Sequence, residues 1–279
     1  KLDNSIDKIK AIILIQVKVI KKYENLITIV LSQIWGTEER NTNCRRYVMD
    51  YIKTVEDNAI LRKLIEALKE LHNLEPEQPV NIQDVEDNFL SKTFDRLAKV
   101  ENLVPFANKE FIKINGNYYK NVFFCKEELT EVIKTVYPKV FKLIHGDCTF
   151  SNLMFDTFNM KAILIDPRGY FGKTKLYGDI DYDWAKLYYS VVGDYDQFNR
   201  KNFSLEINQN NVELEIVSNN WKNLEQDFFE LIGANPRKIK LLHAIIWLSL
   251  TTYAWEDYDA ICGAFYKGLL ELQRYLDDE

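Results

Sequence analysis

Apolar residues recur along most of this chain at the spacing of an amphipathic helix. In residues 55–72 the apolar positions fall every three or four residues, at Leu61, Leu64, Ile65, Leu68 and Leu71, so one face of a helix would be apolar. Similar spacing predicts further helices over residues 84–100, 126–136, 181–192, 221–232, 236–253 and 263–276. Pro236 suits the first turn of its helix, where its missing N–H is not needed.

Shorter apolar runs predict a small β unit in the middle of the chain. Residues 140–144 are typical of a strand, and residues 153–155 and 162–165 of two strands joined by a turn around Asp156 and Asn159. Near the N-terminus an apolar stripe over residues 6–34 favours a helix. The segment is also rich in β-branched residues, so two strands joined by a turn are the alternative. The pattern therefore predicts a mostly helical body around a small β unit.

Composition narrows the class of protein. The 279 residues, 47% of them apolar, are enough for one large domain or two lobes sharing a core. A net charge of −6 argues against a nucleic-acid surface and suits neutral or cationic small substrates. The four cysteines form no CxxC pair, no signal-peptide pattern is present, and no apolar run would span a membrane, so we expect a cytoplasmic protein.

Polar residues at the ends of the apolar runs carry the candidate chemistry. Asp147 and Asn152 follow the strand 140–144, and Asp166 follows the strand 162–165. Phosphoryl transfer from a nucleotide needs a carboxylate to accept the hydroxyl proton and oxygen ligands for magnesium, and these three side chains supply both. Read singly, each would be an ordinary turn or cap residue, because Asp and Asn are common in both places.

The order of these residues resembles a known signature. His145-Gly146-Asp147, Asn152, Ile165-Asp166, Gly178-Asp179 and Asp183-Trp184-Ala185 are similar to the motifs of the aminoglycoside phosphotransferase and choline kinase family, which has a protein-kinase-like fold. The resemblance implies that Asp147 is the catalytic base, that Asn152 and Asp166 bind Mg²⁺, and that His145 and Asp179 brace the catalytic loop. Asp179 and Asp183 are equally well placed to cap the helix that starts near residue 181.

The resemblance extends upstream to a hinge. Residues 47–52 look like the strand whose backbone meets the adenine ring, which implies nucleotide binding at Met49, Asp50 and Tyr51. The expected fold class is α+β: a protein-kinase-like, mostly helical catalytic lobe with its hinge in residues 48–279, and a reduced or partial N-terminal lobe in residues 1–47. No glycine precedes Gly36, so the loop that covers the phosphates in this family has no counterpart. The lobe is therefore truncated, completed by another chain, or degenerate.

The acceptor is less well defined. Residues 251–258 combine aromatic and acidic side chains where the family forms its acceptor pocket, which implies roles for Trp255 and Asp257, although aromatic residues there would equally fill the core. Arg168 and Tyr170, just after Asp166, are placed to reach phosphate or acceptor. The segment 166–172 looks like the branch of the family found with bacterial surface-polysaccharide genes, which favours a sugar or sugar-like acceptor over choline or an aminoglycoside.

We therefore expect a Mg²⁺-dependent kinase that uses ATP or GTP to phosphorylate a small-molecule hydroxyl, with no nucleic-acid or membrane partner. The alternative is a pseudokinase-like binding or scaffolding module, favoured by the incomplete nucleotide half. A weaker alternative is a metal-dependent hydrolase that uses the same carboxylates. The sequence leaves the acceptor, the nucleotide and the oligomeric state open.

Overall fold

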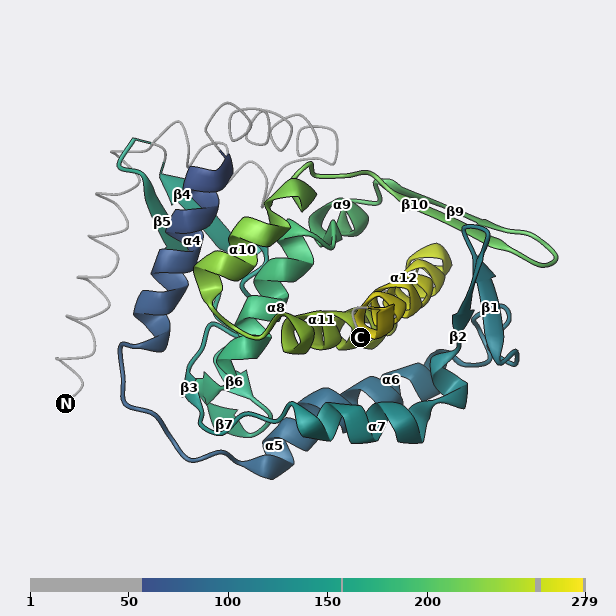
Figure 1. The fold of residues 1–279 in the computed structure, drawn as a ribbon, viewed down its shortest axis with the longest axis horizontal. Coiled ribbons are helices and arrows are strands. Elements are labelled where there is room, and N and C mark those ends of the chain that lie inside the picture. Colours follow the sequence, from purple (N-terminus) through teal and green to yellow (C-terminus); the bar gives the residue numbers. More distant parts are fainter. Residues whose placement is uncertain (1–56, 157, 254–256, 278–279) are drawn as a thin grey trace, which may run out of the picture. The chain divides into compact units, whose positions relative to one another are not determined.

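The computed structural model describes residues 57–156, 158–253 and 257–277 (Figure 1). The chain divides into two units, residues 1–57 and 58–279, and the second is the one described here. The predicted N-terminal lobe, its boundary at residues 47/48 and the hinge residues Met49, Asp50 and Tyr51 lie outside the described residues. No helix in the described part is long and apolar enough to cross a membrane.

The unit belongs to the α+β class, as expected, and its helices follow the apolar spacing closely. The first helix, α4 (Asp57–His72), buries the leucines at 61, 64 and 68. The segment predicted as one helix over 84–100 is interrupted by a π-helical turn, giving α5 (Ile82–Glu86), η1 (Asp87–Ser91) and α6 (Lys92–Val100). The remaining helices are α7 (Lys126–Thr135), α8 (Ile180–Val191), α9 (Tyr195–Asn199), α10 (Glu225–Ile232), α11 (Pro236–Leu250) and α12 (Tyr258–Asp277). Short 3₁₀ turns are η2 (Val122–Phe124), η3 (Phe150–Asn152) and η4 (Lys222–Leu224).

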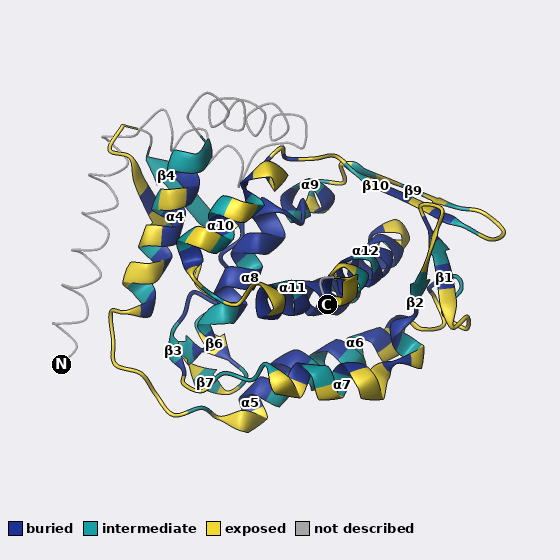
Figure 2. Cartoon of the chain, viewed as in Figure 1, coloured by how far each residue is buried: buried dark blue, intermediate teal, exposed yellow. Residues whose placement is uncertain are grey.

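Three helices form the centre of the core. Helix α11 packs against both α8 and α12, and most residues of all three helices are buried (Figure 2). Trp247 is fully buried and meets Tyr189 edge to face, with ring centroids 4.7 Å apart. Aromatic packing of this kind stabilises a core beyond the area it buries. Helix α8 is thus held rigidly, which matters because its first turn contacts the predicted catalytic loop.

The predicted hairpin is present. Strands β4 (Leu153–Asp156) and β5 (Lys161–Leu164) pair antiparallel, and the Asp156 carboxylate accepts the backbone N–H groups of residues 158 and 159 in the turn. The strand predicted over 140–144 is shorter, as β3 (Lys142–Leu143), and pairs with β8 (Tyr177–Gly178). Strands β6 (Tyr170–Phe171) and β7 (Thr174–Lys175) form a second small hairpin after Asp166.

A four-stranded sheet was not predicted. Its order is β2-β1-β10-β9, from β1 (Phe111–Ile114), β2 (Asn117–Lys120), β9 (Phe203–Ile207) and β10 (Val212–Ile216). Asn115 and Gly116 have φ of 48° and 83° between β1 and β2, the backbone that a tight hairpin turn needs. The Asn115 side chain extends the sheet by donating to the Leu214 carbonyl and accepting the Leu214 N–H, at 2.9 and 2.8 Å.

The hairpin after Asp166 is anchored to the α5 helix by one buried carboxylate. Asp84 accepts the backbone N–H groups of Lys173 and Thr174 at 2.8 and 2.9 Å, and also the Thr174 hydroxyl at 2.5 Å. It also accepts the Asn81 side-chain amide at 2.9 Å. A Cβ on Gly172 would lie 2.4 Å from the same carboxylate, so the turn comes this close only because residue 172 is glycine.

We predict that Asp84→Ala lowers the free energy of unfolding by about 2–4 kcal/mol, because several partly buried donors lose their acceptor at once. Urea denaturation followed by circular dichroism measures this. Asp95→Ala is the control, since Asp95 is an exposed carboxylate on the neighbouring α6 helix. Equal destabilisation by the two substitutions would contradict the anchoring role of Asp84.

Candidate functional site

The loop between β3 and β4 is held by the buried carboxylate of Asp183, in the first turns of α8. Asp183 is 0% exposed and accepts the backbone N–H groups of His145 and Gly146 at 2.8 and 2.7 Å. His72, at the end of α4, donates its Nε2–H to the same carboxylate at 3.0 Å. A buried carboxylate is stable only when its oxygens are hydrogen-bonded, and here three donors meet that need. The start of the loop is therefore fixed.

His145 links this loop to the segment that carries Asp166. Its Nε2 donates to the Ile165 carbonyl at 2.9 Å, and its Nδ1 accepts the Asp147 N–H at 3.3 Å. These two partners assign Nε2 as the donor and Nδ1 as the acceptor of the ring. In return the Arg168 N–H donates to the His145 carbonyl at 2.8 Å. The structural role that the resemblance implied for His145 thus has a direct counterpart in these contacts.

Gly146 permits this close approach. Its φ is +79°, and a Cβ at this position would lie 2.9 Å from the Cβ of Arg168. Both the backbone conformation and the space require glycine.

Asp147, the predicted base, is half-buried and lies between a cation and an amide. Its Oδ1 is 2.8 Å from the Lys186 ammonium, and its Oδ2 accepts the Asn152 amide at 3.1 Å. Burial raises the pKa of Asp147, but the charges of Lys186 and Arg168 and the hydrogen bond from Lys186 outweigh burial and hold the pKa below its usual value of 3.8. Burial lowers the pKa of Lys186, but Tyr182 and Asp147 outweigh it and raise that pKa. Both partners are therefore charged at neutral pH.

Asn152 lies beside Asp147, as predicted, and is fixed by its backbone as well as its side chain. Its Nδ2 donates to the Asp147 carbonyl at 2.8 Å as well as to the carboxylate. Its carbonyl accepts the Ile165 N–H at 3.0 Å, which places it next to the end of β5. Because Nδ2 makes the side-chain hydrogen bonds, Oδ1 is the atom left to bind a cation.

Asp166 follows β5 and is exposed, with a φ of +52°. That left-handed backbone is uncommon for a residue with a side chain, and such strain concentrates at functional sites. No group of three or more His, Cys, Asp or Glu side chains in the described residues could hold a metal. Mg²⁺ needs fewer protein ligands than such a group provides. One or two protein oxygens are enough, because substrate phosphates and waters complete its coordination. The Asn152 Oδ1 and the Asp166 carboxylate are oxygen donors of the kind that Mg²⁺ binds, and the backbone bond from Ile165 to Asn152 links the two segments that carry them.

The brace predicted at Asp179 is provided by Asp183 instead. Asp179 caps α8, accepting the Asp181 N–H at 3.0 Å, and pairs with Lys238 at 2.8 Å. Burial raises the pKa of Asp179 to about 6, against the opposing effect of Lys238. The two acids stand four residues apart at the start of one helix, and only Asp183 faces the loop. The capping role considered for Asp179 is confirmed, whereas Asp183 does not cap.

The predicted substrate residues separate into two groups. The Arg168 guanidinium lies over the Tyr170 ring, 4.5 Å from its centroid, and contributes to the electrostatic environment of Asp147. Asp257 instead accepts the Ala260 N–H at the start of α12 at 2.9 Å and pairs with Lys201. These contacts explain Asp257 structurally. Trp255 lies outside the described residues.

The sequence interpretation assigned no role to Lys186, Lys92 or Arg96. Lys186 is three residues after Asp183 on α8, so helical periodicity alone would have placed both on the side facing the loop. Lys92 and Arg96 lie one turn apart on α6. The sequence gave no indication that they have a functional role, because charged residues on a helix usually face water. All three lie close to Asp147 or to Tyr182, the α8 residue next to Asp183.

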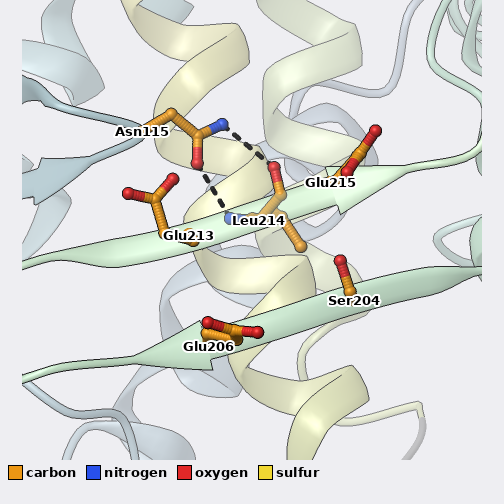
Figure 3. A pocket seen from close by; sticks show the side chains of 6 residues that line it. All are labelled: Asn115, Ser204, Glu206, Glu213, Leu214 and Glu215. Carbon is orange, nitrogen blue, oxygen red and sulfur yellow. Dashed lines mark hydrogen bonds between the residues drawn. The ribbon is translucent and has the colours of Figure 1, made fainter.

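A separate hollow of about 400 Å³ lies on the four-stranded sheet (Figure 3). Its lining is strongly acidic and includes none of the residues predicted for the site: Asn115, Ser204, Glu206, Glu213, Leu214 and Glu215. A surface with three glutamates would repel the phosphates of a nucleotide. This hollow does not share the chemistry of the Asp147 loop.

We predict that Gly146→Ala destabilises the protein more than Gly233→Ala does. Both glycines have positive φ, but a Cβ on Gly233 would meet nothing within 4 Å, whereas one on Gly146 would clash with Arg168. The clash should add about 1–3 kcal/mol to the backbone strain common to the two variants. Urea denaturation of both variants measures the difference, and equal losses of stability would show that the loop has room to move.

No family model, curated protein or solved structure matches this chain, so functional assignment rests on the geometry of the Asp147 loop and on the sequence motifs.

Proposed function

We propose that this protein is a Mg²⁺-dependent phosphotransferase with a protein-kinase-like catalytic lobe, which transfers phosphate from ATP or GTP to a hydroxyl group of a small molecule. One observation carries the proposal. The loop held by Asp183 sets Asp147 beside Asn152, and His145 connects that loop to the segment carrying Asp166. Asp147 and Asn152 are hydrogen-bonded to each other, and Asp166 directly follows Ile165, whose backbone is bonded to both His145 and Asn152.

Asp147 would orient the acceptor hydroxyl and accept its proton. Each oxygen of an ionised carboxylate has two lone pairs, so Asp147 keeps acceptor capacity after binding Lys186 and Asn152. The hydroxyl oxygen attacks the γ-phosphorus, the bond to the β-phosphate oxygen breaks, and the nucleoside diphosphate leaves. Because the transition state of this reaction is loose, positioning matters more than a strong base, which accords with the lowered pKa of Asp147.

Asn152 and Asp166 would hold Mg²⁺, which on binding neutralises charge on the transferred phosphate. The backbone bond from Ile165 to Asn152 couples the positions of these two ligands. Preorganisation of this kind is what a catalytic metal site needs, since a ligand displaced by an ångström loses much of its effect.

We predict that Asp147→Asn lowers kcat by roughly 10²–10⁴-fold and leaves the fold intact, because the variant loses the proton acceptor but keeps a side chain of the same shape. Nucleotide consumption with a panel of sugars, amino sugars, choline and aminoglycosides measures turnover. Glu127→Gln is the control, since Glu127 is an exposed carboxylate on α7.

Near-native turnover by Asp147→Asn would refute the mechanism. Calorimetry with Mg-ATP and Mg-GTP tests the alternative of a binding module, which predicts no turnover with any acceptor. Phosphate release without a phosphorylated acceptor would point to a hydrolase.

The pairing with Lys186 also predicts a pH dependence. Asp147 must be ionised to act as a base, so wild-type kcat/KM should fall only below the usual aspartate pKa of 3.8. Lys186→Met removes the main charge that lowers the pKa of Asp147 while burial still raises it, so the acid limb should move to higher pH. Lys186→Arg, which keeps the charge, should leave the limb near its wild-type position. An unmoved limb in Lys186→Met would show that Lys186 does not control the ionisation of Asp147.

A further inference from the structure

Four cations from three separate parts of the chain gather around Tyr182, and two of them, Arg168 and Lys186, also lie close to Asp147. Lys92 and Arg96 come from α6, Arg168 follows Asp166, and Lys186 lies on α8. Tyr182 is shared between them: the Lys92 ammonium is 6.0 Å from the centre of its ring, and Arg168 donates to its hydroxyl at 3.5 Å. We refer to Lys92, Arg96, Arg168 and Lys186 as the cationic cluster.

Carboxylates do not balance this charge. Among the described residues, Lys186 is the one member of the cluster with a salt bridge, to Asp147. Arg96 donates instead to the Ser249 carbonyl at 2.6 Å, and Arg168 lies over the Tyr170 ring. None of the four is fully exposed, so water solvates these charges only in part. Partly buried charges without a carboxylate partner cost free energy, so a bound anion would stabilise Lys92, Arg96 and Arg168.

The electrostatics of the cluster agree with this arrangement. Burial raises the pKa of Tyr182, but Lys92, Lys186 and Arg168 outweigh it and lower the pKa. Tyr182 raises the pKa of Lys92, yet burial and the three other cations outweigh it and lower that pKa as well. Each shift reports an excess of positive charge around the Tyr182 ring.

We propose that the cationic cluster binds an anionic group, a phosphate or a carboxylate, that the hydroxyl acceptor already carries. This deepens the proposed function and rests on it. Arg168 and Lys186 lie close enough to Asp147 to affect its ionisation, whereas Lys92 and Arg96 extend the positive region along α6. An acceptor could thus hold its hydroxyl at Asp147 and its anionic group on α6. Cationic acceptors such as choline or an amino sugar would be repelled.

The transfer itself is unchanged by this group. The acceptor hydroxyl oxygen forms a bond to the γ-phosphorus, the bond from that phosphorus to the β-phosphate oxygen breaks, and the departing diphosphate takes the electron pair. Asp147 receives the proton. The pre-existing phosphate or carboxylate stays intact and only positions the acceptor, so the product carries one phosphate more than the substrate.

The test uses the full chain and sets of sugars that differ only in charge. The first set is glucose, glucosamine, glucose 6-phosphate and glucuronate, and the corresponding derivatives of galactose and mannose form two more sets. Nucleotide consumption gives kcat and KM, and thermal shift without nucleotide gives binding. We expect turnover with anionic members of the sets and little with neutral or amino sugars. Lys92→Gln and Arg96→Gln should each raise the KM for the acceptor about 10-fold, as loss of one charge-assisted contact would, with the KM for nucleotide unchanged.

Lys99→Gln is the matched control, because Lys99 is an exposed cation on the same helix. Inorganic phosphate, tested by thermal shift with saturating Mg-ADP present, gives a readout independent of the sugars chosen. It should stabilise the wild type and Lys99→Gln but not the double variant of Lys92→Gln and Arg96→Gln.

The possible results separate the two proposals. Binding of phosphate that depends on Lys92 and Arg96, without transfer to any sugar, would support the anion site and count against the kinase. Transfer to neutral or amino sugars that is insensitive to Lys92→Gln and Arg96→Gln would support the kinase and overturn the anion site. A rise in the KM for nucleotide alone would also overturn it, since the cluster would then bind the donor phosphates. Equal stabilisation of the wild type and all variants by phosphate would also overturn the anion site.

Discussion

The Asp183 carboxylate is the interaction on which the rest of the site depends. It joins the end of α4 to the start of the loop between β3 and β4, through partners 111 and 38 residues away in the sequence. With no exposure to water, the carboxylate has only these donors to replace its hydration, so moving one of them leaves a buried charge unsatisfied. The backbone at the start of this loop is therefore fixed. His145 can then reach Ile165, and Asp147 can lie between Lys186 and Asn152.

The charge around Asp147 has the opposite sign to the net charge of the protein. The net charge of −6 suits neutral or cationic substrates, whereas the surroundings of Asp147 are dominated by lysine and arginine. At physiological ionic strength charges are screened beyond roughly 8 Å, so a ligand at Asp147 responds to the nearby cations and hardly at all to the acidic remainder of the surface. Net charge therefore bears on partners that contact large surfaces, such as nucleic acids, and says little about a ligand bound at one site.

The parts of the structure that the sequence predicted are those set by local patterns. Helices α4, α7, α8 and α11 follow their apolar periodicity, and the β4–β5 hairpin follows its turn residues. The four-stranded sheet was missed because its central pairing, of β1 with β10, joins Ile114 to Val212 across a long sequence separation. An Asn-Gly pair between two apolar runs indicates a β-hairpin, so Asn115-Gly116 could have predicted the turn between β1 and β2. The brace was assigned to Asp179 rather than Asp183 because both begin one helix, and only tertiary packing decides which faces the loop.

The structure separates scaffold charges from candidate ligand-binding charges by whether the protein itself satisfies them. Asp183 and Asp84 each accept several donors, and the buried Glu271 pairs with the buried Lys267 and with Arg274 at the surface. Lys92 and Arg168, by contrast, meet aromatic rings and a phenol rather than carboxylates in the described part of the chain. A buried charge that already has its partners within the protein is not stabilised further by a ligand. A buried charge that lacks such a partner is stabilised when a ligand of opposite charge binds. By that criterion Asp183 belongs to the framework, and the cations around Tyr182 are the candidates for binding an anion.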